Sequence, residues 1–404
     1  MTARTPRRPL HVVQISRDAD LLRPLPGSEP VERQLAYARE LHRQAPESML
    51  TIIVVAPHTD SNGWQRDNAR IVPVGGFFRG CVRCLKVLRR LHRRTPISVI
   101  TTQVPYDEAW LALALGRWHG IPVIGQIHSD LFAEHGAAPF RTRVKAASRR
   151  WATRKALRAF AAVRTVSSAA RTSIATFAGA LPVVTIPVPV PMVTSTARPA
   201  STSDKEPRVI FVGRLAPEKD LDRWLAVART VSQRHPSARF EIVGDGPERE
   251  RLEKEGERLG LGRVLSFTGF VPHAQLGEVY ARAAVLLLTS QAEGFGRVLV
   301  EAASQGVAAV STSVAGPRDI IIHGVTGFLH EPGDVDGLAR SVSSLLEHPL
   351  RAVAMGARAQ TLASARFDPA RLRAAWVNLW VTTADAAARL DAPQSRDASP
   401  LRSN

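Results

Sequence analysis

Residues 291–302, with the sequence QAEGFGRVLVEA, combine the residue types that a phosphate-bearing, hydroxyl-rich ligand requires. Gly294 and Gly296 let the backbone approach a ligand closely, and the helix predicted from about residue 297 begins with unpaired N–H groups that favour an anion. Glu293 and Glu301 flank this turn. A simpler interpretation stays open at this point: Glu293 would be a helix-start carboxylate and Glu301 a solvated surface residue.

A second candidate feature is the turn GRLAPEK, in which Arg214 and Lys219 stand five positions apart after Gly213. Guanidinium and ammonium groups both make charge-assisted hydrogen bonds to phosphate oxygens, so the pair could clamp a diphosphate. Two solvated surface cations would give the same pattern. Further along, Gly244 lies in VGDGP and Gly316 in VAGP, and either glycine could serve turn geometry alone.

The elements that position these residues alternate between strand-like and helix-like runs, which predicts parallel sheets covered by helices. The expected strands are 10–15, 49–55, 97–101, 123–127, 162–166, 208–212, 239–243, 264–268, 285–288, 308–312 and 327–329. The expected helices are 31–43, 81–94, 110–119, 221–234, 248–259, 274–283, 298–305, 335–346 and 369–390. The prediction is an α/β protein with two doubly wound, Rossmann-like domains that face each other across a ligand-binding cleft.

The domain boundaries follow from a Pro/Ser/Thr-rich passage between the two alternating halves. We expect an N-terminal domain over 1–190, a linker over 191–207, a C-terminal domain over 208–365, a helix over 366–390 that packs back towards the N-terminal domain, and a disordered tail over 391–404.

The chain resembles glycosyltransferase family 4, the retaining nucleotide-sugar glycosyltransferases of the GT-B fold. The matching segments occur in order: FVGRLAPEKDL, FEIVGDGPERERLE, LSFTGFVPHAQLGEVYARAAVLLLTSQAEGFGRVLVEAASQGVAAVSTSVAGPRDII and GVTGFLHEPGD. The resemblance implies a hexosyltransferase with retention at the anomeric carbon, the C-terminal domain binding the nucleotide-diphosphate sugar and the N-terminal domain the acceptor.

The resemblance also implies a role for each motif residue. Arg214 and Lys219 would neutralise the donor diphosphate, and Glu301 would hold the ribose hydroxyls. Glu293 would face the transferred sugar together with the backbone of Gly294, Phe295 and Gly296, while Gly213 and Gly244 would shape the donor loops. Fixed cations at the phosphates stabilise the charge that develops on the leaving oxygen. No carboxylate pair of the DxD type occurs in these loops, so we expect neither a metal nor another cofactor.

In the first half, the segment ending VIGQIHSD resembles the family strand that ends in a histidine, here His128. Such a residue can contact donor or acceptor hydroxyls or act as an acid/base partner, although a partly buried structural histidine is the alternative. Two features depart from the family. A paired-glycine loop after the first strand is reduced to Gly27, and a common Asn-Gly is replaced by IPVPV at 186–190.

The net charge of +18 lies almost entirely in the first half, where residues 1–203 hold 29 Lys and Arg against 12 Asp and Glu. Basic side chains gather around the apolar face of a helix predicted over 140–160 and in a second cluster over 79–94. A basic amphipathic helix is typical of an anionic membrane surface. We therefore expect a glycan or polyprenyl-diphosphate-linked acceptor at the membrane; an arginine-rich composition is the alternative.

Other features limit the classes of protein that fit. There is no long apolar run and no signal-like N-terminus, so we expect a cytoplasmic enzyme, peripheral at the inner face of the membrane, that serves cell-surface polysaccharide or glycoconjugate assembly. The one CxxC, Cys81 and Cys84, has no second pair. Two alternatives remain: a nucleotide-sugar epimerase on the same fold, and a nucleic-acid-binding protein, for which no recognition motif is present.

Overall fold

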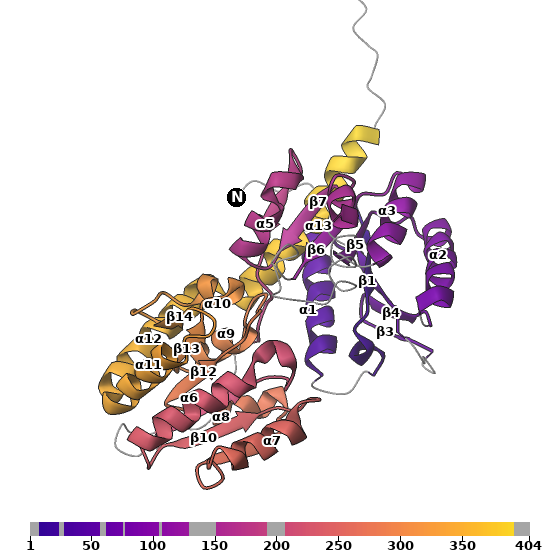
Figure 1. The fold of residues 1–404 in the computed structure, drawn as a ribbon. Coiled ribbons are helices and arrows are strands. Elements are labelled where there is room, and N and C mark those ends of the chain that lie inside the picture. The colour runs from indigo at the N-terminus through magenta and orange to yellow at the C-terminus, as the bar shows by residue number, and fades with distance from the viewer. Residues whose placement is uncertain are drawn as a thin grey trace, which may run out of the picture.

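The computed structural model describes residues 8–23, 28–56, 62–75, 77–104, 107–128, 151–191 and 207–391. These residues form two α/β domains, each built on a largely parallel sheet flanked by helices (Figure 1). The predicted two doubly wound domains are therefore confirmed.

The N-terminal domain holds an eight-stranded sheet in the order β3-β4-β2-β1-β5-β6-β7-β8, with β3 antiparallel to β4. Its strands are β1 (His11–Ser16), β2 (Met49–Val54), β3 (Trp64–Arg66), β4 (Ala69–Pro73), β5 (Val99–Val104), β6 (Val123–Ile127), β7 (Ala162–Thr165) and β8 (Val183–Thr185). Its helices are η1 (Ala19–Leu22), α1 (Glu29–Gln44), α2 (Phe77–Arg94), α3 (Asp107–His119) and α5 (Ser168–Ala178).

Side-chain alternation along the central strands explains why both faces of this sheet are covered. Val12 of β1 belongs to the same apolar cluster as Leu35 of α1, whereas its neighbour Val13 belongs to the cluster that contains Leu88 of α2 and Ile174 of α5. Successive strand residues point to opposite faces, so a strand that is apolar throughout must be buried on both sides.

The C-terminal domain holds a six-stranded parallel sheet in the order β11-β10-β9-β12-β13-β14. Its strands are β9 (Arg208–Val212), β10 (Arg239–Val243), β11 (Leu265–Gly269), β12 (Val285–Leu288), β13 (Ala308–Thr312) and β14 (Gly327–His330). Its helices are η2 (Pro217–Lys219), α6 (Leu221–Arg234), α7 (Arg249–Arg258), η3 (His273–Gln275), α8 (Leu276–Ala281), α9 (Arg297–Ser304), α10 (Ala315–Ile320), α11 (Val335–Glu347) and α12 (Pro349–Arg366).

The last helix, α13 (Pro369–Asp391), leaves the C-terminal domain and runs along the N-terminal one, where it packs against α1 (Figure 1). Trp380 and Trp376 are buried, and the Trp380 ring meets the edge of Tyr37 of α1 at 5.9 Å. The Arg164 guanidinium of β7 stacks over the Trp376 ring at 4.6 Å. The end of the chain thus anchors the N-terminal domain from outside its own sheet.

Several elements were not expected from the sequence, namely β3, β4, β8, α5, α10 and α12. Most of the predicted linker, residues 192–206, lies outside the described residues, as does the predicted tail from residue 392. Among the helices in the described ranges, none is both long enough and apolar enough to span a bilayer.

Candidate active site

The predicted site residues of the C-terminal domain lie in loops that follow the carboxyl ends of β9, β10 and β12. The loop after β9 is held against the loop after β12 by hydrogen bonds. The Thr289 hydroxyl donates to the Lys219 carbonyl at 3.1 Å and to the Asp220 carbonyl at 2.9 Å, and the Gln291 amide donates to the Glu218 carbonyl at 2.9 Å. Asp220 itself takes a left-handed conformation with φ 50°. These bonds fix where the Lys219 side chain starts.

Lys219 and Glu293 form an ion pair across these two loops. The Lys219 Nζ donates to Glu293 Oε2 at 2.6 Å, and both side chains are mostly buried, with 19% and 17% of their surface exposed. The two residues were predicted to contact different parts of a ligand, and the structure brings them into contact with each other. An ammonium group carries three N–H donors, so Lys219 can contact a phosphate oxygen and keep its bond to Glu293.

Close backbone crossing explains the glycines after β9 and β10. A Cβ built at Gly244, whose φ is 132°, would lie 1.9 Å from the Gly213 carbonyl oxygen, and one at Gly246 would lie 2.3 Å from the Leu215 carbonyl oxygen. The Gly213 amide donates to the Val243 carbonyl at 2.9 Å. Only residues without a side chain permit this crossing, which brings the two loops together at the sheet edge.

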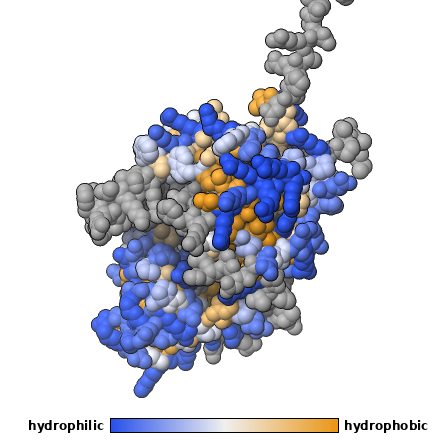
Figure 2. All heavy atoms as spheres, turned by 90° about the vertical axis from the view of Figure 1, so that its right-hand side faces the viewer, coloured by the Kyte–Doolittle hydropathy of each residue, from blue (hydrophilic) through white to orange (hydrophobic). Residues whose placement is uncertain are grey.

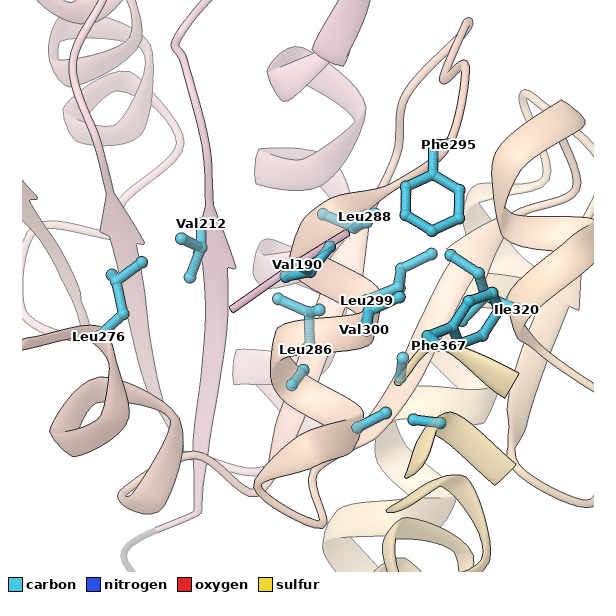
Figure 3. Packing of buried hydrophobic residues seen from close by; sticks show 14 of the residues in the cluster. Val190, Val212, Leu276, Leu286, Leu288, Phe295, Leu299, Val300, Ile320 and Phe367 are labelled. Carbon is cyan, nitrogen blue, oxygen red and sulfur yellow. The ribbon is translucent and has the colours of Figure 1, made fainter. Parts of the chain in front are cut away.

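The glycine-containing turn that was predicted to bind an anion directly precedes α9. Gly296 has φ 91° and occupies the N-cap position, and no side chain caps the helix. The Phe295 side chain is buried, and its ring meets Phe367 edge-on at 5.7 Å, close to Ile320 (Figure 3). Phe295 therefore anchors the turn in the core.

Glu301 is buried rather than solvated, so its interpretation as a surface residue is wrong. Its side chain is 4% exposed, and its Oε2 accepts a hydrogen bond from the Tyr280 hydroxyl at 2.9 Å. Burial, with the adjacent Glu301 carboxylate, raises the pKa of Tyr280 well above its usual value. Tyr280 consequently stays protonated and acts as a donor.

Arg214, the other predicted phosphate ligand, is exposed on the loop after β9. Its side chain lies where solvent can reach it, in contrast with the mostly buried Lys219. Of the two predicted cations, Lys219 is the one that the surrounding loops hold in place.

The carboxyl edges of the two sheets face each other, as two contacts between the domains establish. At the start of α9, Arg297 pairs with Glu29 at the start of α1 at 3.3 Å, and Glu29 also pairs with Arg33 at 2.7 Å. At the start of α5, the Ser168 amide donates to Asp319 of α10 at 2.5 Å. All of these elements follow strand ends, so the contacts lie at the same sheet edges as the loops that carry the predicted site residues.

His128 follows β6 at the carboxyl edge of the N-terminal sheet. Its Nε2 atom is buried and makes no hydrogen bond among the described residues. Burial, together with the charges of Arg164 and Arg33, lowers the pKa of His128 from 6.5 to about 3. The imidazole is therefore neutral at pH 7, which suits a hydrogen-bonding role better than proton donation.

Other predicted features fall partly outside the described residues. These are Gly27 and most of the basic helix predicted over 140–160.

The residues that support the site but were not predicted are Tyr280, Thr289, Asp220 and Glu29. Their roles depend on contacts between segments far apart in the chain, such as the 268 positions between Glu29 and Arg297, and a single sequence holds no signal for such contacts.

Comparison with known proteins covers both domains. The family described as Glycosyltransferase Family 4 matches residues 35–192, and the one described as Glycosyl transferases group 1 matches residues 193–362. A 2-deoxystreptamine glucosyltransferase of Streptomyces kanamyceticus is 30% identical over 283 residues, which is 64% of this chain and 71% of that protein. A 2-deoxystreptamine N-acetyl-D-glucosaminyltransferase of Niallia circulans is 33% identical over 172 residues, 43% of this chain, and the match spans only 44% of that relative.

Solved structures share the arrangement of the two domains. A sucrose-phosphate synthase from Thermosynechococcus elongatus superposes with a TM-score of 0.79 at 19% identity, over 93% of this chain and 100% of that one. HepE of Anabaena, solved with UDP and glucose, superposes with a TM-score of 0.68 at 18% identity, over 92% and 100% of the two chains. The fold is that of the GT-B glycosyltransferases. Within that class, the chain belongs to glycosyltransferase family 4.

Proposed function

We propose that this protein transfers a hexosyl unit from a nucleotide-diphosphate sugar to a glycan or lipid-linked acceptor, with retention at the anomeric carbon. The donor would bind the C-terminal domain and the acceptor the N-terminal domain. The observation that carries the proposal is the convergence of Lys219, the uncapped start of α9 and the Gly213–Gly244 crossing at one sheet edge. HepE, which has the same fold, was solved with UDP-glucose.

The proposed roles of the site residues follow from the charges that develop during sugar transfer. When the bond between the sugar and the diphosphate breaks, negative charge develops on the leaving phosphate oxygen and positive charge at the anomeric carbon. Lys219 and the N–H groups at the start of α9 would stabilise the leaving diphosphate, with exposed Arg214 closing over it. Glu293, held by Lys219, would face the transferred sugar, and Glu301 would hold the ribose. His128, neutral at pH 7, would accept or donate a hydrogen bond to a sugar hydroxyl.

Product analysis tests this function. A panel of UDP-, GDP- and ADP-sugars, incubated with and without a glycan or polyprenyl-diphosphate acceptor, should release nucleoside diphosphate and elongate the acceptor. Conversion of the sugar nucleotide to its epimer without acceptor would favour the epimerase instead. The anomeric configuration of the product, read by NMR, tests retention.

A membrane-linked acceptor is supported by the surface of α2. Exposed cations, among them Arg83, Lys86 and Arg90, lie on this helix. Trp118 at the end of α3 is 73% exposed and stacks under Arg89 at 4.7 Å. Figure 2 shows the face on this side of the molecule, where hydrophilic side chains border apolar ones. Exposed aromatic rings beside cations suit the headgroup layer of an anionic membrane, and the enzyme would act there, at the inner face of the cell membrane.

Liposome co-sedimentation tests the membrane proposal. Reversing the charge of Arg83, Lys86 and Arg90 to glutamate should weaken binding to vesicles that contain phosphatidylglycerol and leave binding to neutral vesicles unchanged. The same three substitutions at Arg239, Arg251 and Lys254 of the C-terminal domain serve as the control. Equal binding by both variants would contradict the proposal.

One relative with broad coverage is named a 2-deoxystreptamine glucosyltransferase, and this favours a second candidate acceptor, a small amino-cyclitol. The basic N-terminal half would repel such a polycation, so charge favours an anionic acceptor. Including 2-deoxystreptamine in the acceptor panel decides between the two.

A further inference from the structure

A cavity with a volume of about 510 Å³ lies at the amino-terminal edge of the N-terminal sheet. Its walls are the segments that lead into β1, β5 and β6, the last turns of α2 and α3, and one face of α13, formed by Ala384, Ala387 and Ala388. The candidate site residues described above follow the carboxyl ends of strands, so this cavity is separate from them. Its volume is within the range of small-molecule sites, roughly 300–1,000 Å³.

Two histidines meet at the wall of this cavity, His92 in the last turn of α2 and His119 at the end of α3. Their ring centroids are 4.9 Å apart. The Ile97 amide donates to His92 Nδ1 at 3.1 Å, so the neutral ring carries its proton on Nε2, which is then a donor. His119 makes no hydrogen bond among the described residues. Both rings can therefore still bind a ligand.

His11 is a third histidine that lines the cavity, but its ring nitrogens are already bonded. The ring is buried, its Nδ1 donates to the Thr95 carbonyl at 3.1 Å, and its Nε2 accepts from the Thr51 hydroxyl at 2.9 Å. Burial is the main cause that lowers the pKa of His11. This ring is therefore neutral at pH 7 and supports the cavity wall without adding charge.

The groups that remain for a ligand are mostly hydrogen-bond donors. Arg8 is exposed at the cavity and forms no ion pair within the described ranges. The Ser98 hydroxyl accepts from the His11 amide at 3.2 Å, and its own proton remains for another acceptor. Glu47 is the one carboxylate among the lining residues. A ligand rich in acceptor oxygens suits this set of donors.

The charge on the two free rings depends on what occupies the cavity. Burial, followed by the neighbouring ring of His119, lowers the pKa of His92. The other charged and titratable groups that line the cavity are Arg8, His11 and Glu47. An anion beside the rings would favour their protonated forms, whereas a cation or a neutral ligand would not. Anion binding at this cavity should therefore take up protons.

We propose that this cavity is a second ligand site of the protein, which binds the phosphate group of a small molecule or of a lipid headgroup through His92, His119 and Arg8. Phosphate oxygens accept charge-assisted hydrogen bonds from imidazolium and guanidinium groups. His119 also stacks on Trp118, which is 73% exposed beside Arg89, so the cavity adjoins the surface that would face a membrane. The inference does not rest on the proposed function.

Sulfate is the probe, because its charge does not change between pH 6 and pH 8. NMR spectra of protein labelled with ¹⁵N-histidine should show saturable shifts of the His92 and His119 imidazole signals as sulfate is added. Arg8→Ala and His119→Ala, read at the His92 signal, should each weaken sulfate binding by about tenfold. The matched control is His42→Ala, an exposed histidine of the same domain outside the cavity, which should leave the affinity unchanged.

The pH dependence separates a contact with the rings from a general effect of charge. The wild-type protein should bind sulfate at least about fivefold more tightly at pH 6 than at pH 8. His92→Gln, which keeps an acceptor for the Ile97 amide but cannot be protonated, should lose most of this difference at the His119 signal. Lys219→Ala should retain it, because sulfate at the donor loops does not contact these rings.

Two further measurements distinguish the sources of the phosphate group. Tighter binding of glycerol 3-phosphate than of sulfate at the His92 and His119 signals would indicate a soluble ligand. Weaker co-sedimentation of His119→Ala than of His42→Ala with vesicles that contain phosphatidic acid would indicate a lipid headgroup. The proposal would be overturned by the absence of a saturable shift at His92 and His119, or by equal sulfate affinity in the wild-type, Arg8→Ala and His119→Ala proteins.

Discussion

At the scale of single residues, the contact between Lys219 and Glu293 changes how the two charges are understood. Each was predicted as a separate ligand group, yet they form a mostly buried ion pair. Removing one partner leaves the other charge buried without compensation, which costs more than the pair contributes. Substitutions at Lys219 and Glu293 should therefore be non-additive, because either one alters the position of the other.

His128 gives a prediction about pH. Its pKa is lowered from 6.5 to about 3 in the folded protein, so below pH 6.5 the unfolded chain binds a proton that the folded chain does not. The contribution of His128 to the free energy of unfolding is full above pH 6.5 and is lost as the pH decreases from 6.5 towards 3. Between pH 7 and pH 5, the wild-type free energy of unfolding should fall by about 2 kcal/mol more than that of His128→Asn. Urea unfolding at both pH values measures this difference.

Comparison with His128→Asn removes the contributions of the other titrating groups, because both proteins contain them. Equal loss of stability in the two proteins would show that His128 is protonated in the folded state at pH 5. That outcome would restore a role as proton donor.

At the scale of elements, the strands were the most predictable part. The inner strands β9 and β12 of the C-terminal domain are almost wholly apolar, because a parallel sheet covered on both faces buries nearly every residue of its inner strands. The strand predicted over 285–288, for example, is fully buried in β12. The short strand β3 is partly exposed and carries no such run, and β8 leads directly into the proline-rich stretch at 187–191. The helix α10 was not predicted because Gly316 and Pro317 favour a turn.

The candidate site was predictable only as a set of loops. Local motifs placed Lys219, Glu293 and Glu301 at strand ends and helix starts, where parallel sheets bind ligands. They could not show that Lys219 contacts Glu293, 74 positions away, or that Tyr280 donates a hydrogen bond to Glu301. Such contacts depend on how α8 and α9 pack, which no pattern within one element determines.

The loop crossing after β9 and β10 gives a prediction at this scale. Gly244→Ala should lower the free energy of unfolding by about 3 kcal/mol and weaken nucleotide binding, because its Cβ would collide with the Gly213 carbonyl at a φ of 132°. Gly262→Ala is the control, since a Cβ there meets nothing within 4 Å. Differential scanning calorimetry with and without nucleotide measures both effects. Similar stability of the two variants would argue against a tight crossing.

At the scale of the whole molecule, two kinds of contact hold the domains together. Polar contacts lie at the facing sheet edges, between Arg297 and Glu29 and between Ser168 and Asp319. Apolar packing of α13 on α1 lies farther along the N-terminal domain. The polar contacts can exchange with water at little cost, whereas the apolar packing cannot. We therefore expect domain movement to break the polar contacts at the sheet edges and to keep the apolar packing of α13 on α1.

The role of α13 can be measured with one substitution. Trp380 is completely buried between Tyr37 and Trp376. Trp380→Ala should lower the free energy of unfolding by about 3–5 kcal/mol, because it leaves a cavity in this contact. Leu390→Ala, on the same helix but 87% exposed, should change it little. Limited proteolysis should then release the C-terminal helix of the Trp380 variant first, and equal protease resistance would contradict this account.

The central claim is that the loops after β9, β10 and β12 bind the nucleoside diphosphate of a sugar donor. Calorimetric titration of UDP, GDP and ADP tests it most directly, using the wild-type protein, Lys219→Ala, Glu301→Ala and the surface control Lys254→Ala. We expect one nucleotide to bind the wild-type and control proteins equally, and at least about tenfold more weakly to Lys219→Ala and Glu301→Ala. Unchanged dissociation constants in those two variants would contradict the claim.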